Sequence, residues 1–253
     1  MGKHKRSAVA ALEYLMQRGI DVPAVVAPDD PGDAADEQRL DLAAKRHGLK
    51  LRSDDDLYQG DASLEGLDLV LSFLFWKRIR RPLIEAGRIG CLNFHPAPLP
   101  DMRGLGGYNV AILEDFAEWG VSAHFVDEDF DTGDLVRVER FPIDREHETA
   151  LSLDIRAQER LLGLFRGVID MTLTGVDLPR RPQGEGRYVT REEFETLRVI
   201  DLSDPPEVTE RRVRAYWYPP YDGATLGAGG LTVASRHVLE QTAWANRRAG
   251  LIP

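Results

Sequence analysis

The segment Asn93-Phe94-His95-Pro96-Ala97-Pro98-Leu99-Pro100 restricts what this chain can fold into more than any other stretch. Asn93 and His95 are two residues apart, so on an extended backbone their side chains point to the same face. The prolines that follow cannot donate to a regular strand ladder, so they end the strand sharply. We therefore predict a strand that presents an amide and an imidazole at its carboxyl end, beside a stiff loop, where catalytic groups are often found.

A second polar stretch, Asp127-Glu128-Asp129-Phe130-Asp131-Thr132-Gly133-Asp134, follows the next strand-like segment. A carboxylate can orient an imidazole, an imidazole can take a proton from an attacking amine, and an amide can donate to a developing oxyanion. These roles suit acyl transfer to an amine. Direct transfer is favoured over an acyl-enzyme, because the single cysteine, Cys91, lies in an apolar strand and no Gly-x-Ser-x-Gly occurs.

The residues alone leave other interpretations open. A histidine at a strand end is more often structural than catalytic, and the segment Asp131–Asp134 is also compatible with a simple Asx turn. His95 and His124 lack the close paired spacing of zinc ligands, so no metal is expected. His124 alternates with apolar neighbours along its strand, which favours a core or supporting position.

Apolar periodicity predicts the fold class. Strand patterns cover 22–27, 49–52, 67–75, 89–94, 121–126 and 135–143, and helical patterns cover 7–18, 37–47, 82–86, 108–119 and 149–174. This alternation predicts an α/β protein with an open, mainly parallel, Rossmann-like sheet in residues 1–175. After a Pro- and Gly-rich linker, two helices at 190–197 and 207–216 and a hairpin around 227–230 predict a small α+β appendage in residues 176–253.

Charge and length exclude several classes of function. The 253 residues carry a net charge of −10, which argues against a nucleic acid as partner, because such binding depends on clustered Lys and Arg. No apolar run approaches the ~20 residues that span a bilayer, and no signal-peptide pattern follows the first residues. We expect a cytoplasmic protein without a membrane partner.

The order Asn-x-His-Pro-x-x-Leu-Pro, then Gly104, then Asp-x-Gly at Asp131 resembles the 10-formyltetrahydrofolate-dependent formyltransferases over about residues 5–175. The resemblance implies the formyltransferase type of Rossmann-like fold, 10-formyltetrahydrofolate as formyl donor and no metal. It also implies that Asn93, His95 and Asp131 are the catalytic residues.

The resemblance further implies two loops that hold the folate. One follows the apolar strand before Asn93 and the other carries Asp131; the predicted folate-binding residues are Phe75, Trp76, Arg78, Ile79, Asp127 and Phe130. For the acceptor we predict contacts from Lys77, Arg103, Gly104, Tyr108, Asn109 and Tyr221. Lys77 and Arg103 suit a diphosphate, although surface charge is the commoner role. Tyr221 suits stacking on a base, with packing of the tail an equal alternative.

The tail favours one branch of this family. Arg214-Ala215-Tyr216-Trp217-Tyr218-Pro219-Pro220 resembles the entry into the reduced C-terminal part of the sugar N-formyltransferases. The acidic charge and short tail fit methionyl-tRNA formyltransferase poorly. We predict a nucleotide-linked amino sugar as acceptor and a homodimer. Another small amine, an inactive folate- or nucleotide-binding module, and hydrolysis of the donor stay as alternatives.

One family element is missing from the pattern. The chain begins almost directly with a helical segment, whereas relatives begin with a strand inside the sheet and a glycine-bearing turn. The expectation is that this strand is absent or that the start is truncated. Only if the chain is complete is a partner chain expected to fill the gap.

Overall fold

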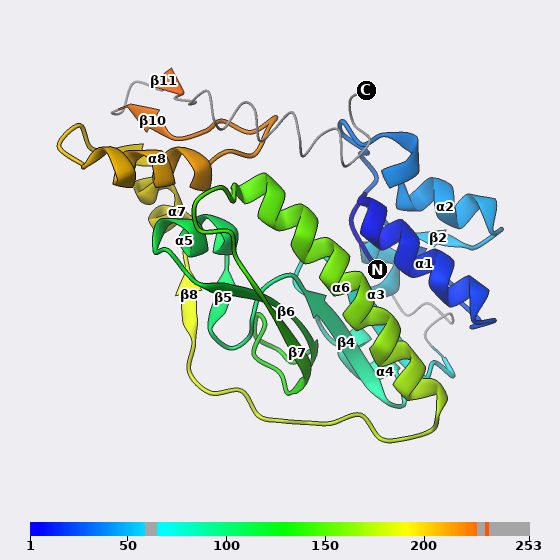
Figure 1. The fold of residues 1–253 in the computed structure, drawn as a ribbon. Coiled ribbons are helices and arrows are strands. Elements are labelled where there is room, and N and C mark those ends of the chain that lie inside the picture. Colours follow the sequence, from blue (N-terminus) through cyan, green and yellow to red (C-terminus); the bar gives the residue numbers. More distant parts are fainter. Residues whose placement is uncertain (59–64, 227–230, 233–253) are drawn as a thin grey trace. The chain divides into compact units, whose positions relative to one another are not determined.

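The computed structural model describes residues 1–58, 65–226 and 231–232 (Figure 1). Its helices are α1 (Arg6–Gln17), η1 (Asp36–Gln38), α2 (Leu40–Arg46), α3 (Asp54–Tyr58), α4 (Leu83–Ala86), α5 (Gly107–Leu113), α6 (Ala150–Leu173), α7 (Arg191–Leu197) and α8 (Pro206–Ala215). Its strands are β1 (Val25–Val26), β2 (Leu51–Arg52), β3 (Leu69–Phe73), β4 (Gly90–His95), β5 (Met102–Gly104), β6 (Glu118–Phe125), β7 (Leu135–Pro142), β8 (Arg187–Val189), β9 (Val199–Ile200), β10 (Thr225–Leu226) and β11 (Leu231–Thr232).

The chain forms two compact units, which are described separately. Unit 1 contains 1–99, 121–139 and 159–184, and unit 2 contains 100–120, 140–158 and 185–253. Both units therefore draw on segments far apart in the sequence. The proposed division at residue 175 stays a prediction about domain organisation.

The sheet of unit 1 places the polar strand ends in register. Its strand order is β3-β4-β6-β7. Strand β4 pairs parallel with β3, where Ser72 lies opposite Asn93, and antiparallel with β6, where Asn93 lies opposite His124. A separate parallel pair joins β1 and β2. The predicted α/β fold with mainly parallel pairing is confirmed, and β6 is the strand that reverses direction.

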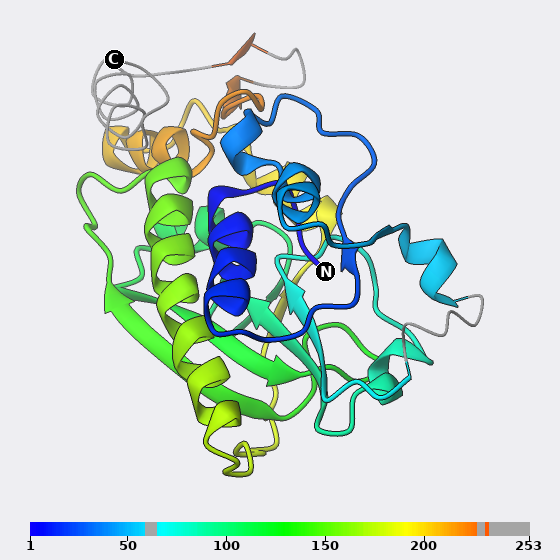
Figure 2. The same cartoon turned by 90° about the vertical axis from the view of Figure 1, so that its right-hand side faces the viewer.

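Helix α6 runs across one face of this sheet (Figures 1 and 2), and an aromatic cluster lies between the helix and the strands. The Phe165 ring lies 5.5 Å from that of Phe73 and 4.8 Å from that of Phe94, and it also meets Tyr14 of α1 at 6.5 Å. Phe73 and Phe94 alternate with Ser72 and Asn93 along their strands. The apolar side chains therefore face α6, whereas the polar ones face the opposite side of the sheet.

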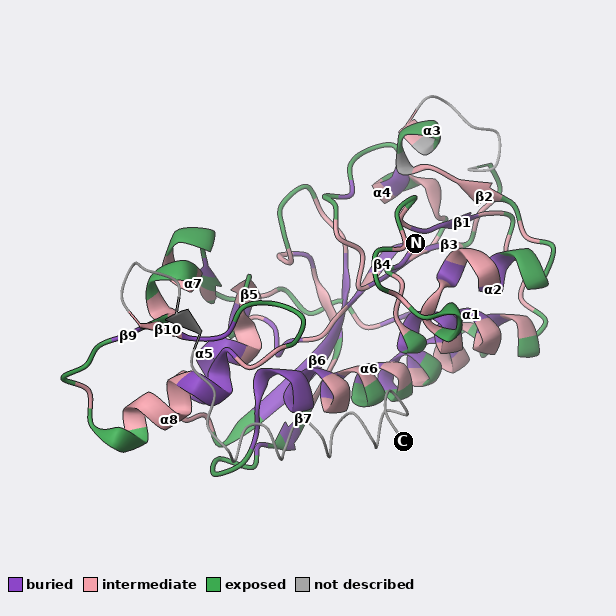
Figure 3. Cartoon of the chain, turned by 90° about the horizontal axis from the view of Figure 1, so that it is seen from above, coloured by how far each residue is buried: buried purple, intermediate pink, exposed green. Residues whose placement is uncertain are grey.

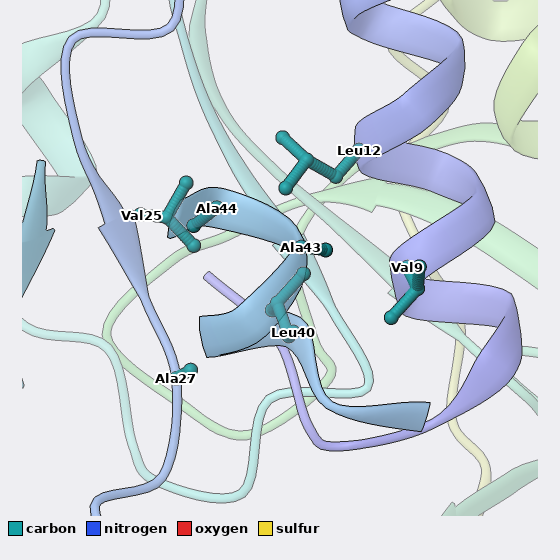
Figure 4. Packing of buried hydrophobic residues seen from close by; sticks show 7 residues of the cluster. All are labelled: Val9, Leu12, Val25, Ala27, Leu40, Ala43 and Ala44. Carbon is teal, nitrogen blue, oxygen red and sulfur yellow. The ribbon is translucent and has the colours of Figure 1, made fainter. Parts of the chain in front are cut away.

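A smaller core holds the first helices against β1. Val9 and Leu12 of α1 pack with Leu40, Ala43 and Ala44 of α2, and Figure 4 shows these side chains around Val25 and Ala27. The apolar residues of α1 recur at helical spacing, which is why the predicted helix at 7–18 is found at Arg6–Gln17.

The first two residues lie between β1 and β3. The Gly2 N–H donates to the Val26 carbonyl at 3.0 Å, and the Phe73 N–H donates to the Met1 carbonyl at 2.9 Å. The Met1 amino group donates to the Leu71 carbonyl at 2.7 Å, and burial lowers its pKa to about 6. A groove of about 650 Å³ adjoins these residues, and its lining combines apolar residues such as Leu15 and Leu69 with charged ones such as Arg18 and Asp68. Gly2 also forms a parallel bridge with Phe73, so Met1 and Gly2 connect β1 with β3 at the start of the chain, where a missing strand was predicted.

Unit 2 corrects one predicted helix. The pattern at 108–119 predicts one helix up to Gly120, but α5 ends at Leu113 and β6 begins at Glu118. Asp115 has a φ of 58°, a left-handed conformation that terminates the helix. Trp119 then becomes a strand residue and is buried, like most of β6 (Figure 3). Helical spacing alone did not reveal this break, because Phe116 and Trp119 continue the apolar stripe.

The C-terminal elements follow the predicted pattern where they are described. Thr190 caps α7, since its hydroxyl accepts from the Glu193 N–H at 3.1 Å. Strands β10 and β11 pair antiparallel, as predicted for the hairpin, and β10 also pairs parallel with β9. The hairpin tip at 227–230 and the predicted strand residues from 233 onward lie outside the described residues. Within the described part of the chain, no helix is both long and apolar enough to cross a bilayer.

The aromatic cluster under α6 gives a test of the fold. We expect Phe165→Ala to lower the free energy of unfolding by about 3–5 kcal/mol, because it removes a buried ring that contacts Phe73 of β3 and Phe94 of β4. Urea unfolding followed by circular dichroism measures this change. As control, Glu159→Ala on the exposed side of α6 should change it by less than about 0.5 kcal/mol. An equal effect of the two variants would contradict the packing described here.

Candidate active site

A row of polar side chains crosses three strands of the unit 1 sheet. Asn93 on β4 lies between Ser72 on β3 and His124 on β6, and all three point away from α6. The Ser72 hydroxyl donates to Asn93 Oδ1 at 2.7 Å, and Asn93 Nδ2 lies 3.1 Å from His124 Nε2. The amide of Asn93 is therefore held at both ends by neighbouring strands.

The loop after β6 carries Asp131 into this row. Asp131 has a φ of 55°, a left-handed conformation that aspartate tolerates better than most residues. Gly133 follows where no other residue fits, because an added Cβ would lie 2.0 Å from the Phe125 carbonyl oxygen. Gln183 donates to the Gly133 carbonyl at 2.6 Å. The close approach at Gly133 folds the loop back over β6 and brings the Asp131 carboxylate to the end of the sheet.

Asn93, His95 and Asp131 converge as the sequence predicts. Asp131 Oδ1 lies 3.3 Å from Asn93 Nδ2 and 3.6 Å from His95 Nδ1. The side chains of His95 and Asp131 are 15% and 16% exposed, so solvent reaches both only in part. A carboxylate beside Nδ1 favours the tautomer with the proton on Nδ1, in which Nε2 is the nitrogen that can accept a proton. The arrangement provides a proton acceptor and an amide donor around one carboxylate.

His124 on β6 contacts both Asn93 and Asp131. Its Nδ1 lies 2.7 Å from the Phe125 carbonyl oxygen, and its Nε2 lies 3.5 Å from Asp131 Oδ1. The side chain is only 2% exposed, in agreement with the supporting position predicted for it. Sequence reasoning missed Ser72, although it is a polar residue in an otherwise apolar strand that ends beside β4.

The Pro-rich loop after His95 is fixed to β6 by one side chain. The Ser122 hydroxyl donates to the Ala97 carbonyl at 2.7 Å and accepts from the Leu99 N–H at 2.9 Å. Ser122 also lies opposite His95 in the strand pairing. The loop is thus held on the same face of the sheet as the imidazole.

Comparison with known proteins fits this geometry. The family model described as formyl transferase matches residues 22–163, more than half of the chain. The chain belongs to the formyl transferase family. A methionyl-tRNA formyltransferase of Acidovorax ebreus is 32% identical over 248 residues, which cover 90% of this chain and 75% of that protein. The predicted assignment to an enzyme of formyl transfer is confirmed.

Other relatives belong to the sugar branch. GDP-perosamine N-formyltransferase of Brucella melitensis is 30% identical over 176 residues, covering 70% of this chain and 66% of that protein. Among solved structures, an N-formyltransferase of Helicobacter canadensis aligns with a TM-score of 0.75 at 20% identity, covering 89% and 82% of the two chains. A likely sugar N-formyltransferase of Mycobacterium tuberculosis aligns with a TM-score of 0.71 at 23% identity, covering 93% and 94%. These structural likenesses confirm the formyltransferase fold.

Two loops of this formyltransferase that were predicted to hold folate lie against each other. The Arg78 guanidinium donates to the Glu128 carbonyl, lies 3.4 Å from Asp129 Oδ1, and stacks 5.6 Å from the centre of the Phe130 ring. Arg81 of the first loop also pairs with Glu128 at 3.1 Å. The first loop and the Asp131 loop are therefore tied together by several contacts within unit 1.

The residues predicted to bind folate differ in how far their side chains are exposed to a ligand. Phe75 and Trp76 form a half-buried ring pair with centres 4.5 Å apart, and Phe130 is exposed. Ile79 is instead buried in the small core around α4, so its side chain is not available to a ligand. Asp127 uses its carboxylate within its own loop, accepting from the Thr132 hydroxyl at 2.7 Å.

The predicted acceptor residues are divided between the units. Lys77 is an exposed residue of unit 1, whereas the other predicted acceptor residues belong to unit 2. Arg103 and Gly104 lie on β5, which pairs parallel with β8. Gly104 has a φ of +83°, and an added Cβ would lie 2.5 Å from the Val189 carbonyl oxygen, so this position requires glycine for the strand pairing.

The remaining three predicted acceptor residues differ in exposure. Asn109 is buried and donates to the Ala215 carbonyl at 2.7 Å, which joins α5 to α8. The hydroxyl of Tyr108 is buried, and burial followed by the charge of Asp154 raises its pKa well above the usual value. Tyr221 is 74% exposed beside Tyr218. Of these three, only Tyr221 offers a large free ring surface.

Cys91 lies two residues before Asn93 but is not available for chemistry. It is 1% exposed, and burial raises the pKa of its thiol to about 12. A buried neutral thiol cannot act as the nucleophile of an acyl-enzyme. Among the described residues there is also no cluster of three or more His, Cys, Asp or Glu side chains arranged to bind a metal ion.

The state of Cys91 can be measured directly. We expect the folded protein to show almost no free thiol towards a disulfide reagent at pH 8, because the group is both buried and neutral there. In denaturant one thiol per chain should react, since the pKa returns to its ordinary value near 8.5. Rapid reaction of the folded protein at pH 8 would show that the Cys91 thiol is accessible and would contradict this prediction.

Proposed function

We propose that this formyltransferase moves the formyl group of 10-formyltetrahydrofolate to the primary amine of a nucleotide-linked amino sugar. The observation that carries the proposal is the convergence of Asn93, His95 and Asp131, with Asp131 Oδ1 within 3.6 Å of the other two side chains. An amide donor, a proton acceptor and a carboxylate are the groups that direct acyl transfer to an amine requires.

The residues take distinct roles in this proposal. The amine nitrogen attacks the formyl carbon, and Asn93 donates to the formyl oxygen as it becomes negative. His95 accepts the amine proton on Nε2, while Asp131 holds Nδ1–H and stabilises the charged ring. The bond from the formyl carbon to the folate nitrogen then breaks, that nitrogen takes up the proton held by His95, directly or through water, and the products are a formamide and tetrahydrofolate. The 3.6 Å separation of His95 and Asp131 is expected to shorten when both substrates are bound.

Support for the donor comes from the two tied loops and from solved relatives. The Helicobacter canadensis structure is described as a complex with folinic acid, and a similar sugar 3-N-formyltransferase with 5-N-formyltetrahydrofolate. In this chain, Trp76 and Phe130 supply aromatic surface near exposed backbone of the two loops. Both features fit a planar, polar-edged pterin ring next to the Asn93 amide.

Support for the acceptor comes from charge and relatives. The Helicobacter canadensis structure also contains dTDP-3-aminofucose, and the Brucella relative is named for GDP-perosamine. The net charge of −10 disfavours a tRNA, which carries one phosphate per nucleotide. The rival acceptor is methionyl-tRNA, because methionyl-tRNA formyltransferases are similar to this chain at 32% identity. The homodimer and the cytoplasmic location stay predictions from the sequence.

The role assignment has a direct test. We expect Asn93→Ala and His95→Ala each to lower turnover by about 10²–10⁴-fold, because each removes a group that acts on the transition state. Folate binding, measured by fluorescence or calorimetry, should largely survive. As a matched control, His47→Ala replaces an imidazole that pairs with Glu13 on the surface of unit 1 and should leave turnover unchanged. Near-normal turnover of both active-site variants would refute the roles.

The acceptor has a separate test. With isotopically labelled formyl donor, dTDP- and GDP-linked 3-amino and 4-amino sugars should be formylated, and methionyl-tRNA should not. The control is an authentic methionyl-tRNA formyltransferase in the same assay, which verifies the tRNA. Formylation of methionyl-tRNA alone would overturn the sugar proposal. Formate release without any acceptor would instead indicate hydrolysis of the donor.

A further inference from the structure

We propose that Ser72 is a positioning residue, which determines which end of the Asn93 amide faces the reacting formyl group. This inference rests on the proposed function, in which Asn93 donates to the formyl oxygen. Ser72 lies directly opposite Asn93 in the parallel pairing of β3 and β4, and its hydroxyl donates to Asn93 Oδ1 at 2.7 Å. The residue is only 1% exposed, so water does not compete for this bond.

The orientation of the amide follows from a chain of hydrogen bonds. His124 Nδ1 lies 2.7 Å from the Phe125 carbonyl oxygen, and a carbonyl can only accept, so the imidazole proton is on Nδ1. Asp131 Oδ1 is a carboxylate oxygen, which only accepts, and it lies 3.3 Å from the Asn93 atom that is 3.1 Å from His124 Nε2. That Asn93 atom must therefore be a donor, which identifies it as Nδ2. Asn93 Oδ1 therefore faces Ser72, which can donate to it.

This orientation matters because the two ends of an amide have opposite electrostatic character. The NH2 end stabilises a developing oxyanion, whereas the carbonyl end repels it. Asn93 Nδ2 also lies 3.3 Å from Asp131 Oδ1, and the hydrogen on that side is the one proposed to turn from the carboxylate to the formyl oxygen when the substrates are bound. Without the Ser72 hydroxyl, the buried Oδ1 loses its donor, and rotation of the side chain becomes easier.

The surroundings of Ser72 support a specific role for its hydroxyl. Val70, which shares its face of β3, belongs to an apolar core with Cys91 and Leu83. A buried hydroxyl in such a region is unfavourable unless it is hydrogen-bonded. Because the hydroxyl of Ser72 reaches Asn93, its presence at this position is explained by the amide rather than by packing.

The test compares variants of Ser72 in the complete chain. Ser72→Ala should lower kcat about tenfold, the effect expected when a buried hydrogen bond to a catalytic group is lost. The KM for the folate donor should change less than twofold, because the folate loops are intact. The pH–rate profile should keep its midpoints, since His95 and Asp131 are not altered. Ser72→Thr keeps the hydroxyl and should restore most of kcat.

Two controls separate positioning from loss of stability. Val70→Ala removes a comparable side chain from the same face and should lower the melting temperature without lowering kcat measured well below it. If Ser72→Ala does not fold, Ser72→Cys replaces it, because the thiol is a similar-sized but weaker donor and should give an intermediate kcat. In the Asn93→Ala background, Ser72→Ala should have no further effect on the residual turnover.

The outcomes distinguish the inference from the proposed function. A fall in kcat for Ser72→Ala that disappears in the Asn93→Ala background supports the inference. Wild-type kcat for Ser72→Ala together with an inactive Asn93→Ala variant overturns it and leaves the proposed function standing. Near-normal turnover of Asn93→Ala refutes the role of Asn93 itself. A loss for Ser72→Ala that adds fully to that of Asn93→Ala shows a structural effect and also overturns the inference.

Discussion

The pairing of β4 with a parallel neighbour on one side and an antiparallel neighbour on the other is the constraint on which the site depends. It places Ser72, Asn93 and His124 in one row, because paired residues of adjacent strands project to the same face. A shift of either pairing by one residue would turn these side chains to the face covered by α6. The aromatic contacts of Phe165 with Phe73 and Phe94 oppose such a shift, since they bury the alternate residues of the same strands.

The carboxylate reaches the row through backbone geometry rather than through strand pairing. Gly133 approaches the Phe125 carbonyl so closely that no side chain fits, and Asp131 adopts a left-handed conformation two residues earlier. The contacts of Arg78 with the same loop hold it from the other side. A single loop therefore links the Asp131 carboxylate to the residues proposed to bind the folate, which explains why its sequence combines acidic residues with a glycine.

Local patterns predicted most elements near the site, and they failed where a tertiary feature overrides periodicity. The strands of the unit 1 sheet and the long α6 were found where apolar spacing placed them. The helix predicted at 108–119 stops at Leu113, because Asp115 turns left-handed and Trp119 is buried in β6. Apolar residues at 116 and 119 fit a helix and a strand equally well, so spacing alone did not distinguish them. The pairing of β5 with β8, which requires glycine at 104, was likewise not visible from the sequence.

The sequence by itself determined the types and the order of the residues proposed to be catalytic, because Asn93, His95 and Asp131 occur in motifs whose spacing favours one strand end and one following loop. It also determined that Cys91 is a buried residue of an apolar strand. Only the tertiary structure decided which way the Asn93 amide faces. That orientation depends on Ser72 and His124, which lie 21 and 31 residues away along the chain and meet Asn93 only through strand pairing.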